Sequence, residues 1–466
     1  MKTYRSIVAV AVGVLTSAHA MAQSRPWLAD RAYGEGMGIR TGDLELHPSV
    51  AGEVGYDSNY FQRSGDSGPN YPWDNKGISS AMRFRLTPSL TISTLSPQRK
   101  VGDAAGTTMP PQLNLSAGAF ASYNELVGVS GDDSFSKQRH IDGGVNLLLD
   151  ILPQRPFGVD VMADYLRIVA PSNDPAVTNA WNRDLLHGGV GVTWRPGGGL
   201  FDWRLGYDFQ YNYFESKAFR TYNNIRNTIN TRGRWKFYPR TALIYDAQTS
   251  WLSYSSSTPP RNGGQTIQSR LGINGLVTNH FALLAMAGWA STFYDGKRVR
   301  VPENLNTVIG QAELRWYILP QPKLQPGDAT VGLSSLAVGY IRDFSQSYLA
   351  DYYRRDRGYA NISYFIGGRY LLDLQAGYSR ISHPQHYRAI DARPDRLYPA
   401  LGENRVDAQL FGEYRTSDTF GLNMTLRYDG SVSRSQIAIT TADGETRYDN
   451  LAFSRFSAWL GVRWFM

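Results

Sequence analysis

The chain has 466 residues, carries a formal net charge of +8 and contains no cysteine. Without cysteine it has no disulfide bond, lipoprotein anchor, thiolate metal site or cysteine nucleophile. Its basic residues are spread along the chain instead of gathered in one patch, which argues against a nucleic-acid-binding protein.

Residues 1–22 predict a secretory signal peptide. Lys2 and Arg5 precede an apolar run over residues 7–15, and small residues between positions 18 and 22 offer cleavage sites. The apolar run is too short to span a bilayer as a helix. Residues 23–42 are rich in glycine and charge without sustained periodicity, so we expect a short periplasmic arm there.

From residue 43 onward, apolar and polar side chains alternate with a period of two, which is the signature of β-strands. The pattern predicts an all-β chain, with residues 43–466 forming an antiparallel transmembrane β-barrel of about 18 strands. An even number of strands is typical of bacterial single-chain barrels. The predicted strands cover residues 44–57, 82–93, 113–123, 141–151, 157–165, a segment ending at 194, 201–212, 225–237, 243–254, 267–275, 281–289, 308–318, 331–340, 359–364, 370–378, 406–414, 420–428 and 451–466.

The connections between these segments alternate between long and short, as expected for extracellular loops and periplasmic turns. Two predicted periplasmic connections, 96–110 and 320–328, are longer than the rule allows. The long loops cover 61–76, 171–181, 294–303, 383–402 and 433–448, and the short turns include 153–156, 196–199, 239–240, 278–280, 367–368 and 417–418.

The aromatic residues, among them 29 Tyr and 11 Trp, predict two girdles at the membrane interfaces. Phe420 and Tyr428 are eight residues apart on one predicted strand, which spans about 20 Å at the usual tilt. Beside the short turns lie Trp194, Phe201, Trp203, Trp235, Phe237, Trp316, Phe420 and Trp464, and beside the long loops lie Tyr56, Tyr123, Tyr165, Tyr211, Tyr340, Tyr378 and Tyr428.

The final strand, 451–466, resembles the C-terminal assembly signal of bacterial outer-membrane proteins. Such signals usually end on an aromatic residue, whereas here Phe465 is penultimate and Met466 is last. The resemblance implies the barrel-assembly machinery as a partner, and the fold implies contact with outer-membrane lipid and lipopolysaccharide. The sequence leaves the oligomeric state open.

The polar parity of the strands is predicted to line the interior with charges of both signs. One interpretation is a water-filled pore crossed by a transverse field, and the other is a wall stiffened by Arg–carboxylate pairs. Arg204, Arg226, Arg232, Arg234 and Lys236 form a basic stripe that could attract anions. The predicted pore-lining bases are Arg83, Arg85, Arg204, Arg226, Arg232, Arg234, Lys236, Arg270, Arg427, Arg455 and Arg463, and the acids are Asp142, Asp160, Asp164, Asp208, Asp246, Glu313, Asp407 and Glu413.

We expect neither enzymatic activity nor a cofactor or metal. His47 and Ser49 have the spacing of a barrel phospholipase, but they share the interior parity with Glu45, and Pro48 separates them. The loop from 66 to 75 contains oxygen ligands that could hold calcium, although such loops are usually only solvated turns.

Three motifs add a family resemblance: LELHPS at 44–49, GYDSN at 55–59 and RLTPSL at 85–90. With the signal peptide, they resemble the β-barrel porin families of Gram-negative bacteria, of which some accompany exopolysaccharide export. The resemblance implies a passive conduit with no catalytic residues. It adds a periplasmic polysaccharide-export component to the candidate partners.

The sequence therefore predicts an outer-membrane channel, either for polar solutes or for the secretion of a polysaccharide. The near balance of interior charges argues against strongly acidic polymers. Two alternatives stay open: an adhesion or scaffold barrel that acts through its loops, and a lipid-modifying enzyme that would lose activity in a Ser49→Ala variant.

Overall fold

A computed structural model describes most of the chain from Gly38 to Met466. The predicted signal peptide and most of the predicted arm lie outside the described residues. The described residues are 38–64, 78–94, 112–129, 135, 138–169, 182–196, 199–257, 262–296, 304–318, 334–347, 351–366, 369–384, 386–387, 397–398, 400–433, 436–440, 446–450 and 452–466.

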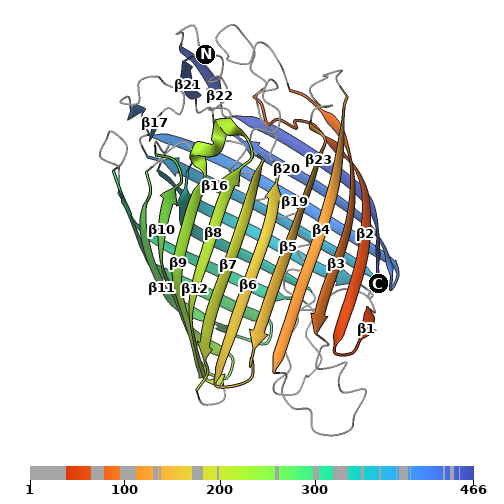
Figure 1. The fold of residues 1–466 in the computed structure, drawn as a ribbon, viewed down its shortest axis with the longest axis vertical. Coiled ribbons are helices and arrows are strands. Elements are labelled where there is room, and N and C mark those ends of the chain that lie inside the picture. The colour runs from red at the N-terminus through yellow and green to blue at the C-terminus, as the bar shows by residue number, and fades with distance from the viewer. Residues whose placement is uncertain are drawn as a thin grey trace.

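The fold is a closed antiparallel transmembrane β-barrel, which confirms the predicted fold class (Figure 1). Eighteen strands form its wall, and one further short strand, β1 (Ile39–Thr41), is added to the same sheet. The wall strands are β2 (Leu44–Asp57), β3 (Ala81–Thr94), β4 (Leu113–Gly128), β5 (His140–Ile151), β6 (Phe157–Ile168), β7 (Arg183–Trp194), β8 (Phe201–Phe214), β9 (Asn224–Tyr238), β10 (Thr241–Tyr254), β11 (Gly264–Leu276), β12 (Phe281–Tyr294), β13 (Leu305–Tyr317), β14 (Ser335–Gln346), β15 (Tyr352–Ile366), β16 (Tyr370–His383), β19 (Leu401–Ser417), β20 (Phe420–Ser431) and β23 (Phe453–Phe465).

The barrel closes where its first wall strand pairs with its last. β2 and β23 run antiparallel, in a register that extends from Ser49 opposite Phe465 to Asp57 opposite Ser457. Every other wall strand pairs with its sequence neighbours on both sides. Closure leaves no long unpaired strand edge, which is the condition for a sheet to cross the apolar part of a membrane.

β1 is an element that the sequence did not predict. It pairs with the beginning of β2, with Ile39 opposite Leu46 and Thr41 opposite Leu44. β23 lies on the same side of β2 but reaches only to Ser49. β1 therefore covers the part of the β2 edge that β23 leaves, and Gly42 forms the connecting turn with a positive φ of 61°.

Alternate side chains along each wall strand face lipid or the interior. On β23, Leu460, Val462 and Trp464 are 60%, 46% and 42% exposed, whereas Trp459 and Arg463 on the opposite parity are each 3% exposed. The same alternation puts Phe84 and Leu86 outside. Large apolar side chains thus cover the outer face, as the predicted period of two requires.

The predicted order of long loops and short turns holds for the connections that the structure describes. Tight turns join β9 to β10 and β19 to β20 at the end opposite the short helix over residues 217–222 (Figure 1). The long periplasmic connections predicted at 96–110 and 320–328 fall outside the described residues. Two smaller strand pairs, β17 (His386–Tyr387) with β18 (Leu397–Tyr398) and β21 (Gln436–Thr440) with β22 (Thr446–Asn450), lie within two of the extracellular connections.

Several strands are longer in the structure than predicted, among them β4, β12 and β19. β14 begins at Ser335 and continues to Gln346, whereas the prediction ended it at residue 340. β15 covers fifteen residues, far more than the predicted 359–364. His383, which the sequence placed in a loop, is the last residue of β16. The apolar–polar alternation is lost at the extracellular ends of these strands, so a search for a period of two does not detect them.

The aromatic residues predicted to form the girdles lie on the outward parity, but two further Trp residues depart from the predicted sorting. Trp194, Trp235 and Trp316 are exposed near the periplasmic turns. Trp251 and Trp289 are also exposed but lie closer to the extracellular ends of their strands. The Trp residues therefore do not belong to one girdle alone.

The only regular helix in the described part of the chain is the short 3-10 helix η4 (Lys217–Tyr222), between β8 and β9. Within these residues, no helix combines the length and the apolar character needed to cross a bilayer.

A disulfide between β2 and β23 tests the closure directly, because the natural chain has no cysteine. Val54 and Leu460 are opposite each other in the register, so a Val54→Cys, Leu460→Cys variant should cross-link on oxidation. The product should migrate differently from the reduced chain on a denaturing gel. The diagonal pair Val54→Cys, Val462→Cys is the control, since its Cβ atoms lie about 7 Å apart. Equal cross-linking of both variants would contradict this register.

Candidate functional site

The interior wall carries its charges mostly as ion pairs. Arg204 Nη2 lies 2.5 Å from Asp160 Oδ2, and Arg357 Nη2 lies 2.7 Å from Asp407 Oδ2. Pairing lowers the local field that each charge would otherwise create. Further pairs join Arg85 to Glu53, Arg234 to Asp202, Arg232 and Arg270 to Asp246, Arg315 to Glu313, Arg355 to Asp343, Arg405 to Glu403, Arg415 and Arg463 to Glu413, and Arg427 to Asp429.

Some of these pairs join strands that are not neighbours, and an interior glycine lies beneath each. Gly191 of β7 lies between Arg204 of β8 and Asp160 of β6, and a Cβ there would lie 2.5 Å from Arg204 Cζ. Gly377 has the same position between β15 and β19, where a Cβ would lie 2.6 Å from Arg357 Nη2. These long side chains can lie flat along the wall because the glycine has no side chain.

The closing seam holds a buried charge cluster. Asp57, at the end of β2, is fully buried between Arg455 of β23, 2.5 Å away, and Arg83 of β3, 3.5 Å away. Trp459 of β23 lies over Gly55, and its ring contacts the guanidinium carbons of Arg83 and Arg85 at 4.6 and 4.7 Å. These cation–π contacts join three strands across the seam.

An aromatic cluster lies beyond the extracellular end of the seam. Tyr60, Phe61 and Phe135 pack against one another with ring centroids 5.2 to 5.8 Å apart, and Leu126 completes the cluster. Burial raises the pKa of the Tyr60 hydroxyl, so this group stays protonated at neutral pH. The cluster fixes the first residues after β2 against the wall.

The extracellular ends of β14 and β15 separate from the neighbouring strands as a two-stranded ribbon, since β13 continues to Leu305 after its pairing with β14 has ended. Pairing of β14 with β13 ends at Arg342, and pairing of β15 with β16 begins at Arg354. β14 and β15 nevertheless stay paired with each other up to Gln346 opposite Tyr352. We call the described residues 343–347 and 351–353 the interior ribbon, because side chains among them contact the far inner wall.

The interior ribbon reaches strands that are four and five places away in the sheet. Arg226 Nη2 on β9 donates to Gln346 Oε1 at 3.0 Å, and Gln346 Nε2 donates to the Tyr254 hydroxyl on β10. Tyr352 stacks on Tyr294 of β12 with centroids 6.4 Å apart and an interplanar angle of 6°. Since four strands of wall separate β14 from β9, these contacts place the ribbon inside the barrel, where it narrows the extracellular half.

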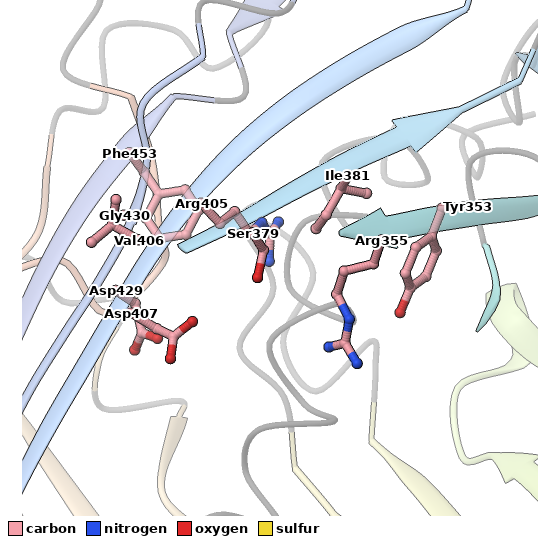
Figure 2. A pocket seen from close by; sticks show the side chains of 10 residues that line it. All are labelled: Tyr353, Arg355, Ser379, Ile381, Arg405, Val406, Asp407, Asp429, Gly430 and Phe453. Atoms are coloured by element: carbon pink, nitrogen blue, oxygen red, sulfur yellow. The ribbon is translucent and has the colours of Figure 1, made fainter. Parts of the chain in front are cut away.

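Pockets flank the interior ribbon on both sides. One, of about 300 Å³, lies between the ribbon and the inner wall of β9 to β12. A second, of about 580 Å³, lies between Tyr352 and Arg354 of β15 and the extracellular ends of β16 and β19. On the other side a smaller pocket extends from β15 to β23, and Figure 2 shows the carboxylates of Asp407 and Asp429 together, with the Arg355 guanidinium across from them. Asp407 and Asp429 are opposite each other in the register, and each is paired with its own arginine, Arg357 and Arg427.

Many of the predicted interior residues form Arg–carboxylate pairs in the structure, whereas others have a different kind of partner. Asp208 accepts a hydrogen bond from Asn230, and Asp164 lies 3.1 Å from His187. The basic stripe is partly compensated, because Arg204, Arg232 and Arg234 each face a carboxylate on an adjoining strand or the next but one. Within the described residues, Asp142 and Lys236 form no ion pair.

Sequence reasoning missed the interior ribbon and its charges. Asp343, Arg355 and Arg357 were in no predicted strand, so their orientation could not be assigned. Only the unusual length of the polar stretch between residues 340 and 359 could have signalled an element there.

The candidate catalytic and metal groups have structural partners or fall outside the described chain. Ser49 Oγ hydrogen-bonds with Ser89 Oγ at 2.5 Å, and His47 Nδ1 lies 3.2 Å from the Met466 carbonyl oxygen. Both residues are buried on the interior parity, away from lipid. The proposed calcium loop at 66–75 lies outside the described residues. Among the described residues, no group of three or more His, Asp or Glu side chains could hold a metal ion.

No family model and no curated protein matches the sequence. Among solved structures, the outer membrane protein OpdK from Pseudomonas aeruginosa is 10% identical, with a TM-score of 0.45 over 91% of this chain and 99% of that one. OccAB4 from Acinetobacter baumannii is 10% identical, with a TM-score of 0.43 over 91% and 98%. The siderophore receptor PirA from P. aeruginosa is 9% identical, with a TM-score of 0.39 over 92% and 81%. A likeness this weak carries no functional inference.

We expect a Gly55→Val variant to destabilise the barrel seam. The new Cβ would lie 2.5 Å from the Trp459 ring and 2.9 Å from the Ala458 carbonyl oxygen, so the ring must leave its place between the two arginines. Overpacking of this kind costs about 1 to 3 kcal/mol.

The measurement is the free energy of unfolding in urea, in detergent or lipid. Gly52→Val is the matched control, because Gly52 faces outward on the same strand and the nearest atom to its Cβ would be 3.9 Å away. Equal stability of the two variants would show that Trp459 does not lie over Gly55.

Proposed function

We propose that this chain is an outer-membrane channel through which small polar solutes pass by diffusion. The observation that carries the proposal is the contrast between the two faces of the wall: large apolar side chains outside, and charged or polar side chains inside on every part of the circumference described. A barrel of about 18 strands encloses an aqueous channel unless something fills it.

The interior ribbon supports a small solute over a polymer as cargo. It lies against β9, β10 and β12 and so occupies part of the cross-section in the extracellular half. Two pockets beside it have the size of small molecules, with volumes of about 300 Å³ and about 580 Å³. A polysaccharide secreted through this barrel would require the ribbon to move away from the wall.

The pairing of interior charges predicts a channel of weak ion selectivity. Where each Arg faces a carboxylate, passing ions meet local fields of both signs with little net preference. Selectivity should therefore respond to the loss of one member of a pair.

Single-channel recording in a planar bilayer tests both the open channel and its weak ion selectivity. The wild-type protein should conduct KCl, and Asp160→Asn should shift the zero-current potential in a KCl gradient toward anions by leaving the Arg204 charge uncompensated. Arg204→Gln should shift it toward cations, and the double variant should return it close to wild type.

Glu125→Gln is the control, because Glu125 lies on the outward parity beside Tyr123 and should leave the zero-current potential unchanged. Absence of conductance in the wild-type protein at all voltages would refute the proposed channel. Conductance that is indifferent to both Asp160→Asn and Arg204→Gln would show that ions do not pass this part of the wall.

A further inference from the structure

The pocket between the interior ribbon and the wall presents hydrogen-bonding groups that the protein itself does not use. Gln248 of β10 and Gln268 of β11 are opposite each other in the register, and both line this pocket. Within the described residues, neither amide is recorded as hydrogen-bonding to another side chain. Each amide offers two donors and an oxygen acceptor, so the pair can bind a group that both donates and accepts.

The charges around the same pocket balance. Arg270 lies 2.9 Å from Asp246, Arg342 lies 3.6 Å from Asp356, and Arg355 lies 2.5 Å from Asp343. Asp351 accepts from Asn262, and Arg226 donates to Gln346. The charged residues that line the pocket are Arg226, Arg270, Arg342, Asp343 and Asp351. Their partners just outside the lining are Asp246, Asp356 and Arg355. With these partners the charges around the pocket sum to zero, so an ionic ligand gains little net attraction here.

The other walls of the pocket supply aromatic and hydroxyl groups. Tyr352 and Phe344 of the ribbon line it, with Tyr294 stacked on Tyr352. Thr266 and Thr292 on the wall hydrogen-bond to each other at 3.1 Å beside the two amides. Aromatic faces suit a ligand with apolar C–H surface, whereas amides and hydroxyls suit its polar edge.

From this lining we propose that the pocket binds a small neutral polyhydroxylated solute, in the size range of a mono- or disaccharide. The proposal rests on the channel function above and names the substrate class of that channel. Vicinal hydroxyl groups both donate and accept, which matches the Gln248 and Gln268 amides. The volume of about 300 Å³ accommodates one or two sugar rings.

The test is a titration of the KCl current with maltose and, separately, with gluconate as an anion of similar chemistry. Maltose should reduce the current saturably, whereas gluconate should not. Gln248→Leu and Gln268→Leu should each raise the half-saturating maltose concentration about three- to tenfold, the usual effect of losing one hydrogen bond. Gln409→Leu is the matched control, because Gln409 shares the interior parity of β19 but does not line the pocket.

A reduction by maltose that does not saturate, or saturation by gluconate alone, would overturn the proposal. Equal effects of the Gln248→Leu and Gln409→Leu substitutions would also overturn it. Calorimetric titration of the detergent-solubilised protein with maltose separates the proposed binding pocket from the proposed channel function. Binding without any KCl current would refute the channel and retain the pocket, and current without binding would do the reverse.

Discussion

The closed hydrogen-bonded wall is the constraint on which the rest of the structure depends. Lipid offers no partners to backbone N–H and C=O groups, so each must be satisfied within the sheet. Pairing of β2 with β23 achieves this and leaves side chains with only two directions, toward lipid or toward the interior. The outer direction is then apolar by necessity, and all chemistry is confined to the inner one.

Within that interior, charge pairing and small residues act together. Arg204 can reach Asp160 across β7 only because Gly191 leaves the wall flat between them. When fixed charges compensate one another in this way, the groups that remain for recognition are neutral amides, hydroxyls and aromatic rings. Gln248 and Gln268 are such groups, and the ribbon brings Tyr352 and Phe344 to face them.

The strands and their faces could be predicted from the sequence because alternation is a local property. β3, for example, shows its apolar and basic parities without reference to any other segment. The partners could not be predicted, since the contact of Asp57 with Arg455 depends on the register of a seam between the two ends of the barrel.

The interior ribbon was missed for a different reason. Its residues leave the lipid boundary, so nothing selects apolar side chains at every second position there. Asp343 therefore carries no periodic signal, although it is paired with Arg355 of the adjoining wall at 2.5 Å. β1 was missed because three residues are too few to show a period.

β1 and the last residue of the chain together cover the edge of β2 at the periplasmic rim. β1 occupies the rim of β2 directly below Met466, whose backbone N–H bonds to the Pro48 carbonyl oxygen. Until both segments have docked, part of that rim is an open strand edge on which a second chain could pair. β1 and Met466 thus both cover the edge of β2 at the periplasmic rim. A barrel that lacks either one would leave backbone groups of β2 open to pairing with a second chain.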